Sequence, residues 1–258
     1  MQNYNKGMSF SLFIGKNRIH LTEIDSTNNY ALEWMKGKRP PEGSLVTAEI
    51  QYQGRGQRGN TWLSKAGLNL TASYILYPVF LSAQGQFWLN KALSLAVADT
   101  IQSILSSEQV QIKWPNDILV RKKKIAGILI ENQLQGTSLS ACVFGIGLNV
   151  NQTDFSQLPL ATSLANITGC TYSIQNVIEE LSSQVEKRYL QLKAANYQLL
   201  QKNYSERLFG LQEGLSLELD NKVHLVKVEE VNALGQLVVE IDGHLRTFSH
   251  GEVKIILD

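Results

Sequence analysis

Gly54-Arg55-Gly56-Gln57-Arg58-Gly59 is a hexapeptide of glycine and polar residues that follows an apolar, β-rich run. Glycine brings backbone N–H groups close to a ligand, and arginine supplies a fork of donors that fits phosphate or carboxylate. The hexapeptide therefore predicts a loop that wraps an anion; a mobile hairpin loop with solvated arginines is the alternative. It matches neither GxxxxGK[ST] nor a GxGxxG that opens a helix, so it lacks the two commonest nucleotide-binding motifs.

Composition limits the classes of protein to consider. The chain has 258 residues, of which 43% are hydrophobic and 18% charged, and its formal net charge is +1. This is typical of a globular protein with one or two domains, and any anion site must be local because no global charge attracts anions. Cys142 and Cys170 give neither a metal spacing nor a disulfide framework. We find no signal peptide and no apolar run of about 18 residues, and we expect a cytoplasmic protein.

Two polar features precede the hexapeptide. Asp25-Ser26-Thr27-Asn28-Asn29 leads into a helical pattern that ends at Gly37. Ser26 and Thr27 are typical of helix N-caps, but hydroxyls and free N–H groups at a helix start also bind small polar ligands. Gln51 follows the apolar run, where it either faces solvent or holds a ligand amide.

A second polar feature interrupts a later strand at Lys113-Trp114-Pro115-Asn116-Asp117. Because proline cannot donate a ladder hydrogen bond, the strand must be broken there or lie at an edge. Asn116 and Asp117 then either point into a cleft or form a β-bulge with local Asx bonding. The basic run 121–124 predicts a tight connection, and Lys124 begins the next apolar run, so its ammonium can reach a cleft while its stem lies on the core.

Hydrophobic periodicity sets the remaining elements. Strands are expected at 18–24, 44–50, 69–76, 110–120 with the break, 125–131 and 140–150, and helices at 30–37, 87–105 and within 160–208. From residue 211 the period changes to two, which predicts a small barrel of short antiparallel strands. We therefore expect an α/β protein with a first domain over 1–208 and a second over 209–258. Trp62 is an aromatic whose commoner place is the core.

These motifs together resemble the biotin–protein ligases. The resemblance lies in Asp25 to Asn28, Gln51 with the hexapeptide and Trp62, KWPND at 113–117, KIAGILIE at 124–131 and GIGLN at 145–149, which occur in the family's order. It implies a class II aminoacyl-tRNA synthetase-like catalytic domain with a mixed sheet flanked by helices, followed by an SH3-like barrel that Gly251-Glu252-Val253 also fits. The chain resembles the short, monofunctional form without a DNA-binding domain, so no DNA partner is expected.

The resemblance also implies a reaction. Biotin and ATP, with Mg²⁺, would form biotinyl-5′-AMP and pyrophosphate. A specific lysine of a carboxylase's biotin carboxyl carrier domain would then attack the mixed anhydride and release AMP. The expected partners are biotin, ATP and that carrier domain, with no membrane, and the protein is expected to be a monomer or a homodimer.

Roles for individual residues follow from the resemblance. Ser26, Thr27 and Gln51 would hold the biotin ring, Arg55 to Arg58 would wrap the phosphate and the biotin carboxylate once ligand is bound, and Asn149 would face the adenylate. Lys124, Asp117 and Arg55 are the expected catalytic residues, and Asp117 is also the expected metal ligand. The full set expected to bind substrate is Ser26, Thr27, Asn28, Gln51, Gly54, Arg55, Gly56, Gln57, Arg58, Trp62, Lys113, Asn116, Lys124, Gly127 and Asn149.

The residue types suit this chemistry. Two anionic substrates must meet, so fixed cations should gather, as Arg55, Arg58, Lys113 and Lys124 can. The acceptor lysine must attack as a neutral amine, which costs about 4 kcal/mol near neutral pH for a reference pKa of about 10.4. A carboxylate such as Asp117 could offset part of this cost by taking the proton.

Two positions depart from the family's pattern. Gln57 stands where many members carry an arginine, which puts retention of the adenylate in question. Ile256 stands where some members have a basic residue near ATP, which leaves the part of the barrel in nucleotide binding open.

Two other functions compete with this interpretation. A lipoate–protein ligase would use a related fold and the same two steps, although KWPND with KIAG favours biotin. A non-catalytic protein that binds a carrier domain is the other alternative, and Lys124 with the complete arginine loop argues against it.

Overall fold

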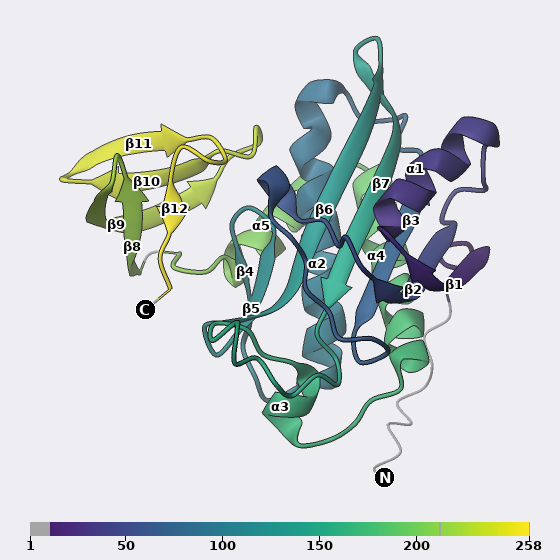
Figure 1. The fold of residues 1–258 in the computed structure, drawn as a ribbon. Helices are drawn as coiled ribbons and strands as arrows, with labels where there is room; N and C mark the ends of the chain where they lie inside the picture. Colours follow the sequence, from purple (N-terminus) through teal and green to yellow (C-terminus); the bar gives the residue numbers. More distant parts are fainter. Residues whose placement is uncertain (1–10, 212, 258) are drawn as a thin grey trace.

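The computed structural model of this chain describes residues 11–211 and 213–257, so residues 1–10 of the expected first domain lie outside the description. A large mixed sheet has helices on both faces, and a small antiparallel sheet lies beside it (Figure 1). This arrangement confirms the predicted fold class. None of the helices in the described part is long and apolar enough to cross a membrane.

The large sheet has seven strands in the order β1-β2-β3-β7-β6-β5-β4. Its strands are β1 (Arg18–Ile24), β2 (Leu45–Gln51), β3 (Leu70–Leu76), β4 (Val110–Lys113), β5 (Asp117–Val120), β6 (Lys123–Gln135) and β7 (Ser138–Leu148). β1 and β2 are parallel, and the other neighbouring pairs are antiparallel. The long hairpin of β6 and β7 therefore lies between β3 and the short β4–β5 hairpin.

Helices cover the two faces of this sheet unequally. They are α1 (Thr27–Gly37), α2 (Gln86–Ile104), α3 (Leu164–Thr168), α4 (Ile174–Lys193) and α5 (Tyr197–Arg207), with short 3₁₀ turns η1 (Gln57–Gly59) and η2 (Ala83–Gly85). Because side chains alternate along a strand, Tyr74 and Phe144 join the main core with α2 and α4, whereas Ile75 and Val143 pack with Ala31 of α1. The α1 face is only partly covered, and the candidate site lies on it.

The predicted strand break at Pro115 is confirmed as a hairpin turn. β4 ends at Lys113 and β5 begins at Asp117, and these two residues are paired across the hairpin. The predicted connection 121–124 is too long, because β6 already begins at Lys123. Arg121 and Lys122 make the turn, with φ values of 52° and 59°.

The small sheet has five antiparallel strands in the order β11-β10-β9-β8-β12. They are β8 (Gly214–Leu219), β9 (Lys222–Val231), β10 (Leu237–Ile241), β11 (His244–Phe248) and β12 (Lys254–Ile255). Leu215, Leu217 and Leu219 alternate inward, as the period of two predicts. Residue 209, where the sequence predicts a domain division, lies between α5 and β8.

The small sheet docks on the large one through specific hydrogen bonds. The buried Lys91 ammonium on α2 donates to the carbonyls of Val231 (2.8 Å) and Asn232 (3.0 Å). Trp114 Nε1 donates to the Gly235 carbonyl at 2.9 Å. These contacts place the turn between β9 and β10 next to α2 and the β4–β5 hairpin.

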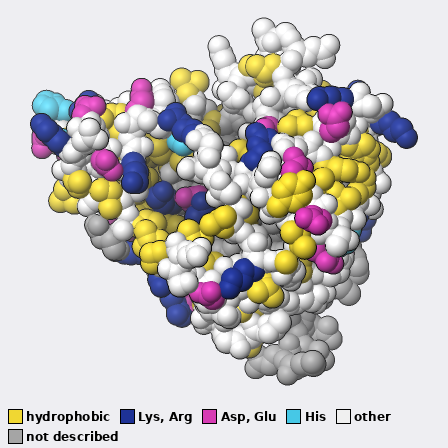
Figure 2. All heavy atoms as spheres, in the orientation of Figure 1, with side chains coloured by type: hydrophobic (Ala, Val, Ile, Leu, Met, Phe, Trp, Pro, Cys, Tyr) yellow, Lys and Arg dark blue, Asp and Glu magenta, His cyan; other side chains and the backbone are white. Residues whose placement is uncertain are grey.

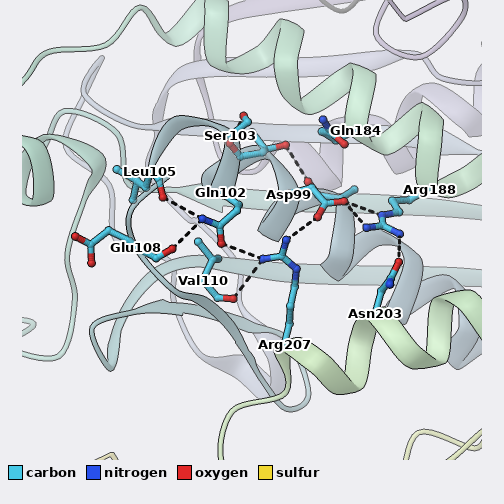
Figure 3. Close-up of polar contacts among 12 residues, drawn as sticks. Asp99, Gln102, Ser103, Leu105, Glu108, Val110, Gln184, Arg188, Asn203 and Arg207 are labelled. Carbon is cyan, nitrogen blue, oxygen red and sulfur yellow. Dashed lines mark hydrogen bonds and ion pairs between the residues drawn. The ribbon is translucent and has the colours of Figure 1, made fainter. Parts of the chain in front are cut away.

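The helices behind the large sheet are joined by a buried charge cluster (Figure 3). Asp99 of α2 pairs with Arg188 of α4 at 2.6 Å and with Arg207 of α5 at 3.0 Å. Arg188 also donates to Asn203, and Arg207 donates to the Val110 carbonyl of β4. One carboxylate thus fixes three helices and an edge strand relative to one another.

Candidate active site

A cavity of about 320 Å³ opens on the α1 face, between the hexapeptide loop, the β6–β7 hairpin, the β4–β5 hairpin and the small sheet. In the space-filling view, basic and acidic side chains lie together in a recess between the small sheet, at the left, and the rest of the molecule (Figure 2). Predicted site residues that line the cavity are Ser26, Thr27, Asn28, Gln51, Arg55, Gly56, Gln57, Arg58, Trp62, Lys113, Asn116, Asp117, Lys124 and Gly127. Segments distant in the sequence therefore meet in one place.

Two glycines of β7 make the floor of the cavity. A Cβ added at Gly147 would lie 2.1 Å from the Trp62 ring, and one added at Gly145 would lie 2.2 Å from Asn28 Oδ1. The Trp62 indole thus packs directly against the Gly147 backbone, where there is no Cβ. It also lies next to Gly127, which pairs with Gly147. Trp62 is only partly buried, so the expectation of an ordinary core aromatic is wrong.

Hydroxyl and amide groups at the start of α1 form one end of the cavity. The Thr27 N–H and hydroxyl both donate to Gln51 Oε1, at 2.9 and 3.2 Å. Ser73 donates from β3 to Thr27 Oγ1 at 2.8 Å. Ser26 occupies the N-cap position and is buried, yet its side chain makes no capping bond. Gln51 therefore faces α1 rather than solvent, and the Ser26 hydroxyl is not used as a cap.

The Arg55 side chain extends from the hexapeptide loop to β6. Its guanidinium forms a two-pronged ion pair with Glu131, at 2.8 and 3.2 Å, and donates to Asn29 Oδ1 at 2.7 Å. Asn28 Nδ2 donates to the same carboxylate at 2.8 Å. A partner for Arg55 was not foreseen, because Glu131 ends a nearly continuous apolar strand. Arg55 thus joins the loop to the α1 end of the cavity.

Arg58 points towards the small sheet. Its φ of 53° is in the left-handed region, and its guanidinium donates to the His250 carbonyl. Neither arginine of the hexapeptide is solvated without a partner, so the alternative of a loop with free arginines is wrong. Between them, Gln57 Oε1 is buried without a hydrogen-bond partner in the described part of the chain.

Lys124 and Lys113 gather around Asp117. Lys124 Nζ lies 2.6 Å from Asp117 Oδ1, and Lys113 Nζ lies 3.7 Å from Oδ2. Burial lowers the pKa of Lys113, Asp117 opposes this shift, and the neighbouring Lys124 ammonium adds to it. Lys124 also lies 5.6 Å from the centre of the Trp62 ring. The cluster carries two cations and one anion, so it presents excess positive charge to the cavity.

A second cavity, of about 390 Å³, adjoins the first. The two share Thr61, Trp62, Asp117 and Lys124. The walls of the second are mainly apolar: Leu63, Leu158, Pro159, Leu160, Ala161 and Leu257. Asn149 lines this second cavity rather than the first, with its Nδ2 bonded to the Thr162 carbonyl at 2.9 Å. Gly54 lies outside both linings, and its carbonyl accepts from Trp62 N at 2.9 Å.

The small sheet contributes residues that the sequence did not identify. His250, Val253, Lys254 and Ile255 line the first cavity. The Lys254 ammonium is close enough to Lys113 to lower its pKa slightly further. Ile256 is used otherwise, because its N–H donates to the Ser216 carbonyl at 2.9 Å. The small sheet thus brings a lysine to the site two residues before the position where the sequence suggested that a cation was missing.

Asp117 is a carboxylate already engaged by two ammonium groups. In residues 11–211 and 213–257, no group of three or more His, Cys, Asp or Glu side chains could hold a metal ion. Mg²⁺ is commonly held by one or two carboxylates together with substrate phosphates. The residues therefore fit a Mg²⁺ that arrives with a polyphosphate, and they do not fit a metal held by the protein alone.

Comparisons with known proteins agree with this geometry. The sequence model of the biotin/lipoate A/B protein ligase family matches residues 21–149. A biotin–[acetyl-CoA-carboxylase] ligase of Mycobacterium tuberculosis is 29% identical over 90% of this chain and 86% of its own length. The bifunctional ligase/repressor BirA of Bacillus spizizenii is 29% identical over 94% of this chain and 75% of its own length.

A solved structure gives the same result for the fold. Biotin protein ligase from Aquifex aeolicus, in complex with biotin and ATP, superposes with a TM-score of 0.78 at 26% identity and covers 94% of this chain and 100% of that chain. The resemblance inferred from the motifs is thus confirmed. This chain belongs to the biotin/lipoate A/B protein ligase family, and it is an enzyme.

Proposed function

We propose that this enzyme activates biotin with ATP as biotinyl-5′-AMP and transfers the biotinyl group to a specific lysine of a biotin carboxyl carrier domain. The observation that carries the proposal is the pair of adjoining cavities that share Lys124 and Asp117. One cavity has a polar end at α1, and the other has apolar walls. A polar bicyclic acid and a nucleotide base would occupy the two, with their reacting groups meeting at Lys124.

In the first half-reaction, the biotin carboxylate attacks the α-phosphorus of ATP, and pyrophosphate leaves. The Thr27, Ser26 and Gln51 groups would hold the ureido ring, which offers both donors and acceptors. Lys124 would lie at the bridging oxygens, where negative charge gathers, and Lys113 would add a second cation. Asn149 and the apolar walls of the second cavity would face the adenosine.

The arginines would have to change partners for this reaction. Arg55 is paired with Glu131, and Arg58 with the His250 carbonyl. A phosphate or carboxylate that enters the cavity would displace the His250 carbonyl from Arg58, because charge-assisted bonds to an anion are stronger than bonds to a carbonyl. It would compete with the Glu131 carboxylate for Arg55 as a second anion. The hexapeptide loop would then close over the ligand, as the sequence predicts.

Mg²⁺ would be held by the ATP phosphates, with Asp117 as the nearby carboxylate. When bound, it would neutralise phosphate charge. Asp117 also holds Lys124 at 2.6 Å, so its role in orienting that ammonium does not depend on the metal.

The expected partner is the carrier domain of a carboxylase, as the name of the Mycobacterium tuberculosis relative suggests. Cys142 and Cys170 are both free thiols. Free thiols and consumption of ATP fit the cytoplasm that the sequence predicts. A monomer or a homodimer remains our prediction for the assembly.

Mass spectrometry tests the proposal directly. The carrier domain of a bacterial acetyl-CoA carboxylase is incubated with this protein, MgATP and either biotin or lipoate. We expect the mass of one biotinyl group on one lysine, and biotin-dependent exchange of pyrophosphate into ATP. Transfer of lipoate instead would support the lipoate–protein ligase. Binding of the carrier domain with neither exchange nor transfer would support the non-catalytic alternative.

A further inference from the structure

The turn after β11 brings an imidazole into the first cavity. His250 is partly buried, lines the cavity, and meets the Trp114 ring edge-on, with centroids 5.9 Å apart. No hydrogen bond to either of its ring nitrogens is formed by the residues that the structure describes. The imidazole is thus free to bond to a substrate.

The position of His250 is well defined. The Glu252 carboxylate accepts from Ser249 N at 2.6 Å, and Glu252 N donates back to the Ser249 carbonyl at 3.1 Å. The His250 carbonyl accepts from Arg58 of the hexapeptide loop. Hydrogen bonds therefore hold the turn after β11 in shape and join it to the hexapeptide loop.

Transfer of the biotinyl group needs a proton acceptor, because the carrier lysine arrives as an ammonium ion. Asp117, the acceptor that the sequence suggested, lies between two ammonium groups, at 2.6 and 3.7 Å. A carboxylate has a reference pKa of about 4, and each Asp117 oxygen already faces an ammonium group. An imidazole, with a reference pKa of about 6.5, is much the better acceptor near neutral pH.

We propose that His250 is the general base of the transfer step; the inference rests on the proposed function. The carrier lysine gives a proton to the free ring nitrogen of His250, and its amine nitrogen attacks the biotinyl carbonyl carbon. The new C–N bond forms as the C–O bond to phosphate breaks, AMP leaves with that electron pair, and the nitrogen loses its second proton to solvent. The imidazolium then releases its proton to solvent.

The charges that face His250 keep it neutral. Burial lowers its pKa first, Arg58 of the loop and Lys113 of β4 lower it further, and Asp117 of β5 raises it. The net direction is downward, so the ring stays unprotonated and ready to accept at pH 7. The rate of transfer should therefore fall in acid as His250 is protonated.

The test compares two amines that accept the biotinyl group, one of which must first lose a proton to a base and one of which need not. Protein loaded with biotinyl-5′-AMP is mixed with the carrier domain or with hydroxylamine, which is already unprotonated at neutral pH. For His250→Gln, we expect the ratio of the carrier rate to the hydroxylamine rate to fall about 100-fold, the size of a typical general-base contribution. His244→Gln, an exposed histidine of β11, should keep the ratio of the unchanged protein.

The pH profile gives a second readout. Transfer to the carrier should fall more steeply below pH 6.5 in the unchanged protein than in His250→Gln, because the variant has no imidazole to protonate. An unchanged ratio, an equal fall with both acceptors, or profiles of equal steepness would overturn the inference. Absence of biotinyl-5′-AMP formation by the unchanged protein would instead overturn the proposed function.

Discussion

Lys124 is the cation shared by both cavities, so its removal tests the site most directly. In Lys124→Ala, Asp117 keeps only the more distant Lys113. In the proposed reaction, the bridging oxygens would also lose a nearby positive charge. We expect biotin-dependent pyrophosphate exchange to fall at least about 100-fold, since one preorganised electrostatic contact contributes that much to a rate. The exchange rate and a thermal melt are measured together.

The neighbouring lysine is the control for this substitution. Lys123 is exposed and begins the same strand, so Lys123→Ala should exchange pyrophosphate as the unchanged protein does. Exchange by Lys124→Ala at the rate of Lys123→Ala would mean that Lys124 pairs with Asp117 but takes no part in forming the adenylate.

Gln57 is the second residue with a testable role. Its Oε1 is buried without a partner beside the first cavity, among the residues that the structure describes. Glutamine carries no charge for a phosphate, whereas a charged contact of this kind contributes about 1.5–3 kcal/mol, or one to two decades in dissociation. In Gln57→Arg, we expect slower release of preformed biotinyl-5′-AMP by stopped flow, and less self-biotinylation.

Gln53→Arg gives the matched comparison for this prediction, because Gln53 is an exposed glutamine a few residues earlier that lines neither cavity. It adds the same charge nearby without adding a contact. Equal release from the two variants, or faster release from Gln57→Arg than from the unchanged protein, would contradict the expected role of Gln57.

At the scale of single residues, the sequence predicted one side of the site and missed the other. The loop, α1 and the two hairpins carry local signals of glycine, proline and polar residues at strand ends. Glu131 gave no such signal because it ends an apolar run, and its partner Arg55 is far away in the sequence. His250 and Lys254 reach the cavity only because the small sheet docks there, which no local pattern encodes.

Among the elements, α2, α4 and α5 share the single carboxylate of Asp99 in addition to their apolar packing. The side chains of Asp99 and Arg188 are only 12% and 8% exposed, so solvent screens this pair weakly. Asp99→Asn would leave two guanidinium groups close together without their anion. We expect urea unfolding to show a loss of about 3 kcal/mol in the free energy of unfolding, as for other broken buried pairs.

An exposed pair provides the contrast for this prediction. Glu33 and Lys36 of α1 are 73% and 72% exposed, so Glu33→Gln should change the free energy of unfolding by less than about 1 kcal/mol. Similar losses for Glu33→Gln and Asp99→Asn would show that the cluster does not hold the helices together.

Elements were the scale at which the sequence was most informative. Strand and helix periodicity predicted nearly every element, and the proline in KWPND predicted the end of β4. Hydrophobic periodicity does not predict the order of the strands in the sheet, because pairs such as β3 with β7 are set by packing between distant segments. The charge cluster was also missed, since Asp99 lies in a helix that otherwise shows only a core pattern.

For the molecule as a whole, Lys91 links the small sheet to the large one. Burial lowers its pKa from 10.5 to about 8. The unfolded chain therefore binds more protons than the folded one between these two values, and the free energy of unfolding should rise with pH across that window. The slope can reach about 1.4 kcal/mol per pH unit.

Lys91→Met should remove this rise, which urea unfolding at pH 8 and pH 10 would show as a difference between the two proteins. Lys202→Met changes a lysine that is 73% exposed on α5, so it should keep the slope of the unchanged protein. A slope that persists in Lys91→Met would mean that other groups cause it.

The last part of the small sheet lines both cavities, through His250 and Lys254 in the first and Leu257 in the second. Chains are synthesised from the N-terminus, and earlier parts begin to fold first. During translation, the large sheet can therefore assemble on the ribosome while the pocket still lacks a wall. A nascent chain would therefore lack a closed cavity in which a reactive acyl phosphate could be held. The complete pocket would form only after residues 250–257 leave the exit tunnel.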